Sequence, residues 1–145
     1  MLSDVTKPGV DVPTDSSRMI WQGYIKTVLG KNKIETSVVE ITLSGADDKL
    51  LNRRLFYFCP PRKLILPKAK ISYQVQQVNE GYQITLQTDN LAKNVLLGTE
   101  AEGFFSDNYF DLLPGERKTV LFKTDRVLDE PQKAFAVRSL VDTFE

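Results

Sequence analysis

The sequence has no histidine and a single cysteine, Cys59, among its 145 residues. The lack of histidine excludes Ser-His and Cys-His nucleophilic sites, imidazole bases and every zinc site that uses imidazole ligands. One cysteine forms neither an intramolecular disulfide nor a cysteine-rich metal site, and it leaves the cellular compartment undetermined. We expect no catalytic residue, no metal and no cofactor in this chain, and these two features remove the histidine- and cysteine-dependent routes to such sites.

Long hydrophobic runs and a net charge are also missing. The longest hydrophobic run, from Leu55 to Cys59, has five residues, whereas a membrane-spanning helix needs about 20. The first residues lack a charged start followed by an apolar stretch, so we expect no signal peptide in this chain. Nineteen basic residues balance nineteen acidic ones, so no net field draws the chain toward nucleic acid or an anionic membrane. We expect neither as a partner.

The composition that remains is that of a globular protein, with 41% hydrophobic and 26% charged residues. Apolar and polar residues alternate over 71–76 and 82–87 around Asn79-Glu80-Gly81, which predicts a hairpin. Further strands are expected at 95–97, 119–123 and 135–141, with a long loop over 99–111. This pattern predicts an all-β fold, with an immunoglobulin-like antiparallel β-sandwich over residues 64–145. A (β/α)-barrel needs about 250 residues and does not fit.

The N-terminal part predicts a less complete structure. Residues 1–16 are polar with Pro8, Gly9 and Pro13, which indicates a flexible lead-in. A short strand at 17–21, a helix within 23–29, and a hairpin of 36–43 with 50–59 are expected to follow. So few strands cannot close a sandwich. Residues 17–63 are therefore expected to be a partial β-sandwich, the C-terminal part of a truncated domain, and residues 17–61 to self-associate or to be disordered.

The expected loop is rich in aromatic side chains. It holds a candidate site for domain docking or sugar contact, made up of Phe104, Phe105, Ser106, Asp107, Asn108, Tyr109 and Phe110. Four large rings within seven residues more often pack against a core or a neighbouring domain than face solvent, because each buries a large apolar area. Exposed rings in the same loop could instead stack on sugars.

Two charged clusters have several interpretations. We favour a solvated turn-forming loop for the acidic cluster, with calcium binding or a paired-carboxylate glycosidase site as alternatives; it comprises Glu100, Glu102, Asp107, Asp111 and Glu116. The basic residues from Lys49 to Lys70 lie near Phe56 and Tyr57, a combination that can indicate a nucleic-acid surface. Strand alternation would divide these basic residues between two faces, which argues against that interpretation.

Three stretches resemble a known family. Residues 102–116, from Glu-Gly-Phe-Phe-Ser-Asp-Asn-Tyr-Phe to Leu-Leu-Pro-Gly-Glu, and the following 118–122 resemble the C-terminal immunoglobulin-like domain of β-mannosidases of glycoside hydrolase family 2. Residues 134–142 resemble the last strand of that domain, and residues 55–64 the end of the β-sandwich before it. The resemblance extends over roughly residues 13–145.

The resemblance implies the end of the fourth domain and the whole of the fifth domain of a retaining hydrolase that removes terminal β-D-mannose residues. In that family the catalytic glutamates lie on a central barrel, and no position here matches them. The implied role is a non-catalytic accessory domain, with the catalytic barrel and neighbouring domains as partners, in an enzyme that is secreted, periplasmic or lysosomal. The alternatives are a carbohydrate-binding module that stacks sugars on Trp21, Phe105 or Tyr109, and an accessory domain of a related exo-β-glucosaminidase.

Overall fold

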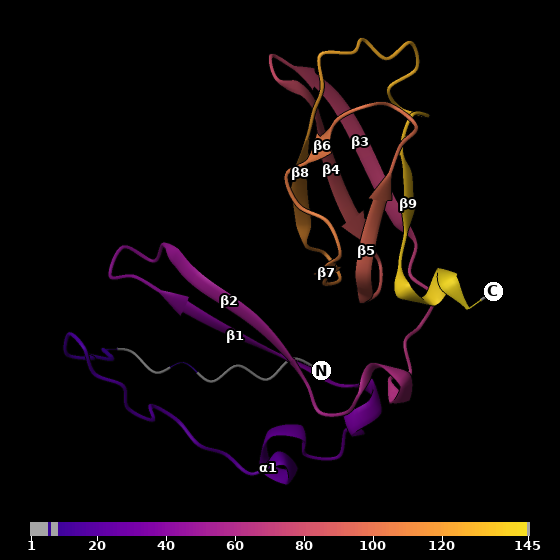
Figure 1. Cartoon of the computed structure of the whole chain (residues 1–145). Helices are drawn as coiled ribbons and strands as arrows, with labels where there is room; N and C mark the ends of the chain where they lie inside the picture. The colour runs from indigo at the N-terminus through magenta and orange to yellow at the C-terminus, as the bar shows by residue number, and fades with distance from the viewer. Residues whose placement is uncertain (1–5, 7–8, 145) are drawn as a thin grey trace. The chain divides into compact units, whose positions relative to one another are not determined.

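The computed structural model describes residue 6 and residues 9–144. The chain forms two compact units, Met1–Leu64 and Ile65–Glu145, and each is described by itself (Figure 1). Residues 1–5 and 7–8 of the expected lead-in lie outside the described residues. No helix in the described part of the chain is both long enough and apolar enough to cross a membrane.

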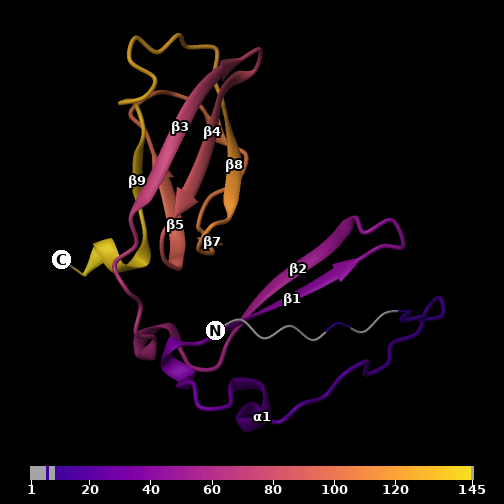
Figure 2. The ribbon, with the colours of Figure 1, turned by 180° about the vertical axis from the view of Figure 1, so that it is seen from behind.

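The second unit is a sandwich of two antiparallel sheets that face each other (Figures 1 and 2). One sheet has the order β3-β4-β8-β6, and its strands are Ile71–Val78, Gly81–Thr88, Arg117–Lys123 and Phe104–Phe105. The other has the order β7-β5-β9, and its strands are Phe110–Leu112, Ala92–Gly98 and Ala136–Arg138. The expected all-β, immunoglobulin-like sandwich is confirmed.

The core of the sandwich follows from strict alternation along β4 and β8. Tyr82, Ile84 and Leu86 of β4 are at most 1% exposed, whereas the residues between them point outward and are half-buried. Across the ladder, Tyr82 pairs with Phe122 of β8. The Phe122 ring also lies 5.4 Å from that of Phe135. Burying such a side chain stabilises the fold by about 1.5–3 kcal/mol.

The edge strand β3 is partly covered by the segment that precedes β9. The Gln132 side-chain amide donates to the Val75 carbonyl oxygen at 2.9 Å. The Tyr73 hydroxyl donates to the Phe135 carbonyl oxygen at 2.7 Å. These bonds satisfy groups on both segments and help to block further strand pairing at this edge.

The last strand is shorter than the sequence pattern predicts. β9 ends at Arg138, and a 3₁₀ helix, η3, covers Leu140–Thr143. The backbone N–H of Ser139 donates to Asp142 Oδ2 at 2.7 Å, and this bond lowers the pKa of the Asp142 carboxyl group. This capping box begins a helix at the position where alternation alone would continue the strand.

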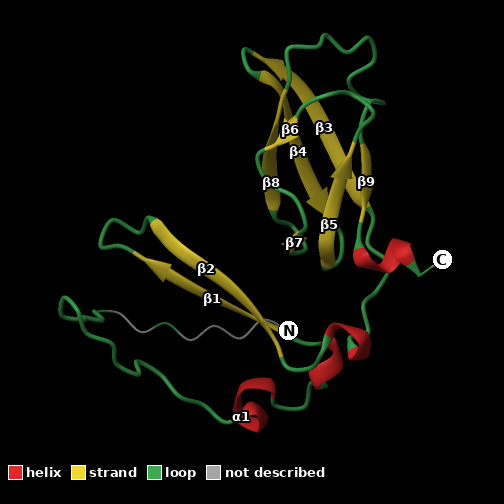
Figure 3. Cartoon of the chain, viewed as in Figure 1, coloured by secondary structure: helices red, strands yellow, loops and turns green. Residues whose placement is uncertain are grey.

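The described residues of the first unit form a hairpin and three short helical segments (Figure 3). The hairpin consists of β1 (Val38–Ser44) and β2 (Leu50–Tyr57). The helical segments are α1 (Ile25–Leu29), η1 (Ile34–Thr36) and η2 (Pro61–Lys63). The prediction of a short strand at 17–21 is wrong, because this segment pairs with no strand in the described part of the chain and leaves Met19 and Trp21 75% and 51% exposed.

Replacing Phe122 by alanine tests whether this ring is central to the sandwich core. We expect Phe122→Ala to lower the free energy of unfolding by about 3–5 kcal/mol, because it removes a fully buried ring and leaves a cavity. The matched variant Phe104→Ala removes a ring that is 80% exposed and should change the free energy of unfolding by less than about 0.5 kcal/mol. Urea denaturation of both variants measures the difference, and equal losses would contradict this account of the core.

Candidate functional site

The aromatic segment is more ordered than the sequence pattern predicts. The loop expected over 99–111 contains β6, which pairs with β8, and the start of β7, which pairs with β5. The expectation of one uninterrupted loop is therefore wrong. β6 and β7 have two and three residues, too few to produce a recognisable alternation in sequence. The candidate loop, residues 104–110, thus connects the two sheets.

Two of its four aromatic rings pack inward. The ring of Phe105 lies 4.8 Å from that of Phe122 and 6.1 Å from that of Phe135. Phe110 packs against the same core, and the Lys118 ammonium lies 4.9 Å from the centre of its ring. Phe105 and Phe110 therefore attach the two ends of the loop to the core.

The polar residues between these rings fix the middle of the loop. Ser106 exchanges two bonds with Leu121: its N–H donates to the Leu121 carbonyl at 2.8 Å, and its hydroxyl accepts from the Leu121 N–H at 2.9 Å. The Asn108 side chain accepts from the Leu97 N–H at 2.8 Å and donates to the Leu97 carbonyl at 2.9 Å. Asp107 forms an ion pair with Lys118 at 2.6 Å. The Asn108 amide thus bonds to β5 as a neighbouring strand would.

The other two rings face solvent. Phe104 is 80% exposed and Tyr109 is 67% exposed. Tyr109 also has a φ of 60°, a left-handed conformation that is strained for a bulky residue. A fixed loop therefore presents two large rings that contribute little to the core. Such a feature is typical of a contact surface.

The structure does not gather the acidic cluster into one site. Asp111 bonds to Lys93 at 3.1 Å and accepts from the backbone N–H of Asn94 at 2.8 Å. Glu116 accepts from the backbone N–H of Leu113 at 3.0 Å. No three acidic or cysteine side chains lie together as metal ligands among the residues described. The bonds of Asp111 and Glu116 to backbone N–H groups agree with the turn-forming interpretation of these two residues.

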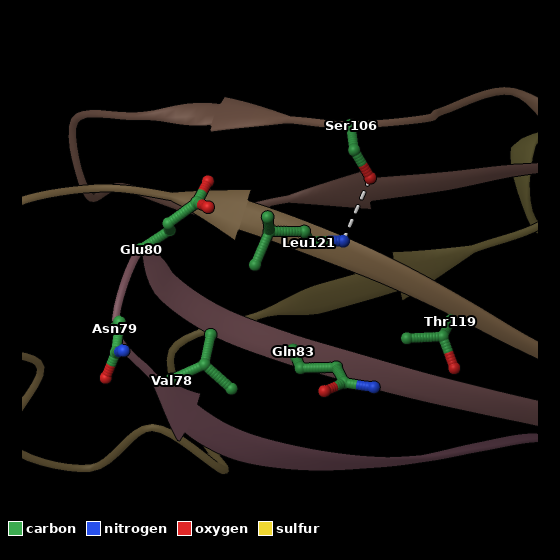
Figure 4. Close-up of a pocket in the computed structure, with 7 residues that line it drawn as sticks. All are labelled: Val78, Asn79, Glu80, Gln83, Ser106, Thr119 and Leu121. Atoms are coloured by element: carbon green, nitrogen blue, oxygen red, sulfur yellow. Dashed lines mark hydrogen bonds between the residues drawn. The ribbon is translucent and has the colours of Figure 1, made fainter.

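A shallow depression of about 630 Å³ lies beside the loop on the outer face of the larger sheet (Figure 4). It is lined by Val78, Asn79, Glu80, Gln83, Ser106, Thr119 and Leu121. Glu80 is the one ionisable residue in this lining, and its hydrogen bond to the Lys123 ammonium at 2.7 Å lowers its pKa. One paired carboxylate does not supply the acid and base that glycoside hydrolysis requires.

The sandwich defines an immunoglobulin-fold domain, and its loop of residues 104–110 exposes the rings of Phe104 and Tyr109. The family model Ig_mannosidase, described as an Ig-fold domain, matches residues 66–143. This match covers more than half of the chain, and the chain therefore belongs to the Ig_mannosidase family of Ig-fold domains. The comparison with curated proteins found no match.

Among solved structures, the chain is similar to the crystal structure of the β-D-mannosidase from Dictyoglomus thermophilum, with 26% identity and a TM-score of 0.61. The matched region covers 71% of this chain and 13% of that one. These findings confirm the resemblance to the C-terminal immunoglobulin-like region of a β-mannosidase. They support an accessory domain of a glycoside hydrolase.

Replacing Asn108 by alanine tests whether its side chain holds the loop. We expect Asn108→Ala to lower the free energy of unfolding by about 2 kcal/mol or more, because both backbone groups of Leu97 lose a partner. Hydrogen exchange at the Leu97 N–H should accelerate in the same variant. The control is Asn79→Ala, which changes an exposed amide in the β3–β4 turn. If both variants unfold alike, Asn108 does not hold the loop.

Proposed function

We propose that the chain is a non-catalytic accessory domain of a β-mannosidase-like hydrolase and that it supports the catalytic barrel through the loop of residues 104–110. The observation that carries this proposal is the exposure of Phe104 and Tyr109 on a segment whose ends and middle are fixed. Aromatic side chains are enriched at the centres of protein interfaces, where they contribute much of the binding energy. A preformed loop also avoids the entropic cost of ordering on contact.

The finer assignment rests on the resemblance of the sequence. We infer a parent enzyme that removes terminal β-D-mannose residues with retention and carries both catalytic carboxylates on its barrel. Residues 64–145 would be its last immunoglobulin-like domain, and residues 17–63 part of a preceding sandwich, after a lead-in of residues 1–16. An accessory domain of an exo-β-glucosaminidase would use the same loop in the same way.

A chimera of the Dictyoglomus thermophilum β-mannosidase tests the supporting role. In it, residues 65–145 of this chain replace only those residues of that enzyme that are aligned with them. We expect the chimera to hydrolyse a β-mannoside and to denature at a higher temperature than the enzyme without this region. The double variant Phe104→Ala with Tyr109→Ala should lose most of this gain in denaturation temperature, because neither side chain could then make apolar contacts with the barrel. The isolated chain should show no turnover.

The control for the chimera is Val127→Ala, since this side chain is 79% exposed and lies outside the loop. We expect the control to match the unmodified chimera in activity and thermal stability. A chimera no more stable than the truncated enzyme would overturn the supporting role. Full stability in the double variant would overturn the role of the loop.

We further propose that the first unit self-associates through one face of its hairpin. Ile41, Leu43 and Phe56 point to the same face and are 56%, 53% and 53% exposed. A two-stranded sheet has two open edges and no second layer among the described residues of this unit. An isolated two-stranded sheet is only marginally stable in water unless another surface covers its apolar face. A second copy of the chain offers the same apolar row.

Charge placed on the apolar face should prevent this association. We expect the wild-type chain to form dimers or larger species in sedimentation velocity, and Ile41→Lys to be monomeric because burial of the ammonium group is costly. Thr42→Lys places the same charge on the opposite face of β1 and should sediment as the wild type does. A wild-type chain that remains monomeric over the accessible concentration range contradicts the proposal.

A further inference from the structure

The centre of the outer face of the larger sheet is mostly polar and carries no charge across three neighbouring strands. Its outward positions include one apolar residue, Leu121, and otherwise carry amide or hydroxyl groups: Ser72, Gln74, Gln76, Gln83, Thr85, Gln87 and Thr119. At the usual surface frequency of charged residues, eight such positions would include about two charges. The charged residues of this face lie at its margins: Arg117 and Lys123 at the two ends of β8, and Glu80, paired with Lys123.

The amide groups on this face are available to a ligand. In the described part of the chain, the side chains of Gln74, Gln76, Gln83 and Gln87 make no hydrogen bond to protein, and Thr85 and Thr119 share one contact of 3.3 Å. The strand register places Gln76 opposite Gln83. Each amide carries two donor hydrogens and an acceptor oxygen. The centre of the face therefore offers adjacent donors and acceptors without a fixed charge, whereas charged residues lie at its margins.

Both depressions described on this unit lie on the same face. The first includes Gln83 and Thr119, and Figure 4 shows its residues on neighbouring strands. The second, of about 190 Å³, includes Gln74, Thr85 and Gln87. Thr85 pairs with Thr119 in the ladder between β4 and β8, so the two depressions adjoin. Together they form a track across the sheet, here called the polar track, in which amide and hydroxyl side chains predominate. Val78 and Leu121 are its apolar residues, and Glu80 and Arg117 lie at its two ends.

We propose that this polar track binds a neutral oligosaccharide. The hydroxyl groups of a sugar both donate and accept hydrogen bonds, as amide and hydroxyl side chains do. The lack of charge at the centre gives no attraction to an anionic polymer. Tyr73, the one large aromatic residue in the two linings, is half-buried and donates its hydroxyl to the Phe135 carbonyl oxygen. The track therefore presents no exposed ring of the kind that dominates protein interfaces. The choice of a sugar rests on the proposed function, whereas the location rests on the sheet face alone.

NMR titration of the ¹⁵N-labelled full chain with β-1,4-mannohexaose tests the proposal. We expect saturable shifts at Gln74, Gln76, Gln83 and Gln87, and none at Phe104 or Tyr109. A parallel titration with cellohexaose shows whether the track distinguishes mannose from glucose. The absence of shifts at millimolar oligosaccharide would overturn the proposal. Shifts confined to Trp21 or to the loop of residues 104–110 would overturn it as well, because the sugar would then stack on exposed rings.

Three single glutamine-to-alanine variants test where the sugar binds: two on the polar track, and one control on the opposite side of β3. Gln76→Ala and Gln83→Ala should each raise the dissociation constant about fivefold, as expected for loss of a hydrogen bond. Gln77→Ala removes the same group from the opposite side of β3, where Gln77 pairs with the buried Tyr82, and should leave binding unchanged. Equal effects of all three variants would overturn the assignment of the face.

Sugar binding by the polar track can be tested separately from docking by the loop of residues 104–110. If the polar track instead contacted protein, Gln83→Ala would lower the stability of the chimera while the chain failed to bind sugar, and the proposal would fall. If the loop variants lowered the stability of the chimera and the chain failed to bind sugar, only the accessory role would stand. Sugar binding that survives in the Phe104→Ala and Tyr109→Ala variants would support the track independently of the loop.

Discussion

The pairing of β4 with β8 is the constraint on which the rest of the second unit depends. This ladder places Tyr82 against Phe122 and Ile84 against Val120 on the inner face, where all four side chains are almost completely buried. β8 in turn holds β6 through its pairing with Phe105. Because Phe122 contacts the rings of both Phe105 and Phe135, one side chain joins the core, the candidate loop and the segment before β9.

The same ladder determines what each surface can do. Alternation along β4 sends apolar residues inward, so the outward positions are free to carry amide and hydroxyl groups without cost to the core. The loop is attached to this ladder at one end and to β5 at the other, through Ser106 and Asn108. A rigid core thus supports two different surfaces, one with exposed rings and one with uncharged polar groups.

The first unit differs from the second in that its hairpin leaves apolar side chains exposed instead of burying them in a core. Its hairpin satisfies many backbone groups, but Ile41, Leu43 and Phe56 remain more than half exposed on one face. Apolar area of this kind has a favourable free energy of transfer out of water. The family assignment and the small share of the related β-mannosidase that the chain matches, 13%, both fit a segment that functions within a larger assembly.

The sequence alone determined the β class, the hairpin of β3 and β4, and the family, because period-two alternation and the motif of residues 102–116 are local signals. It also located the aromatic loop. Tertiary structure decided which rings pack inward, since Phe104 and Phe105 are adjacent in sequence but differ in contact with Phe122. It likewise decided that residues 17–21 lie in no strand of the described chain. These outcomes depend on groups distant in sequence, which no local pattern specifies. The helix after Ser139 is different, because its capping box joins residues only three positions apart and is a local signal that competes with the alternation.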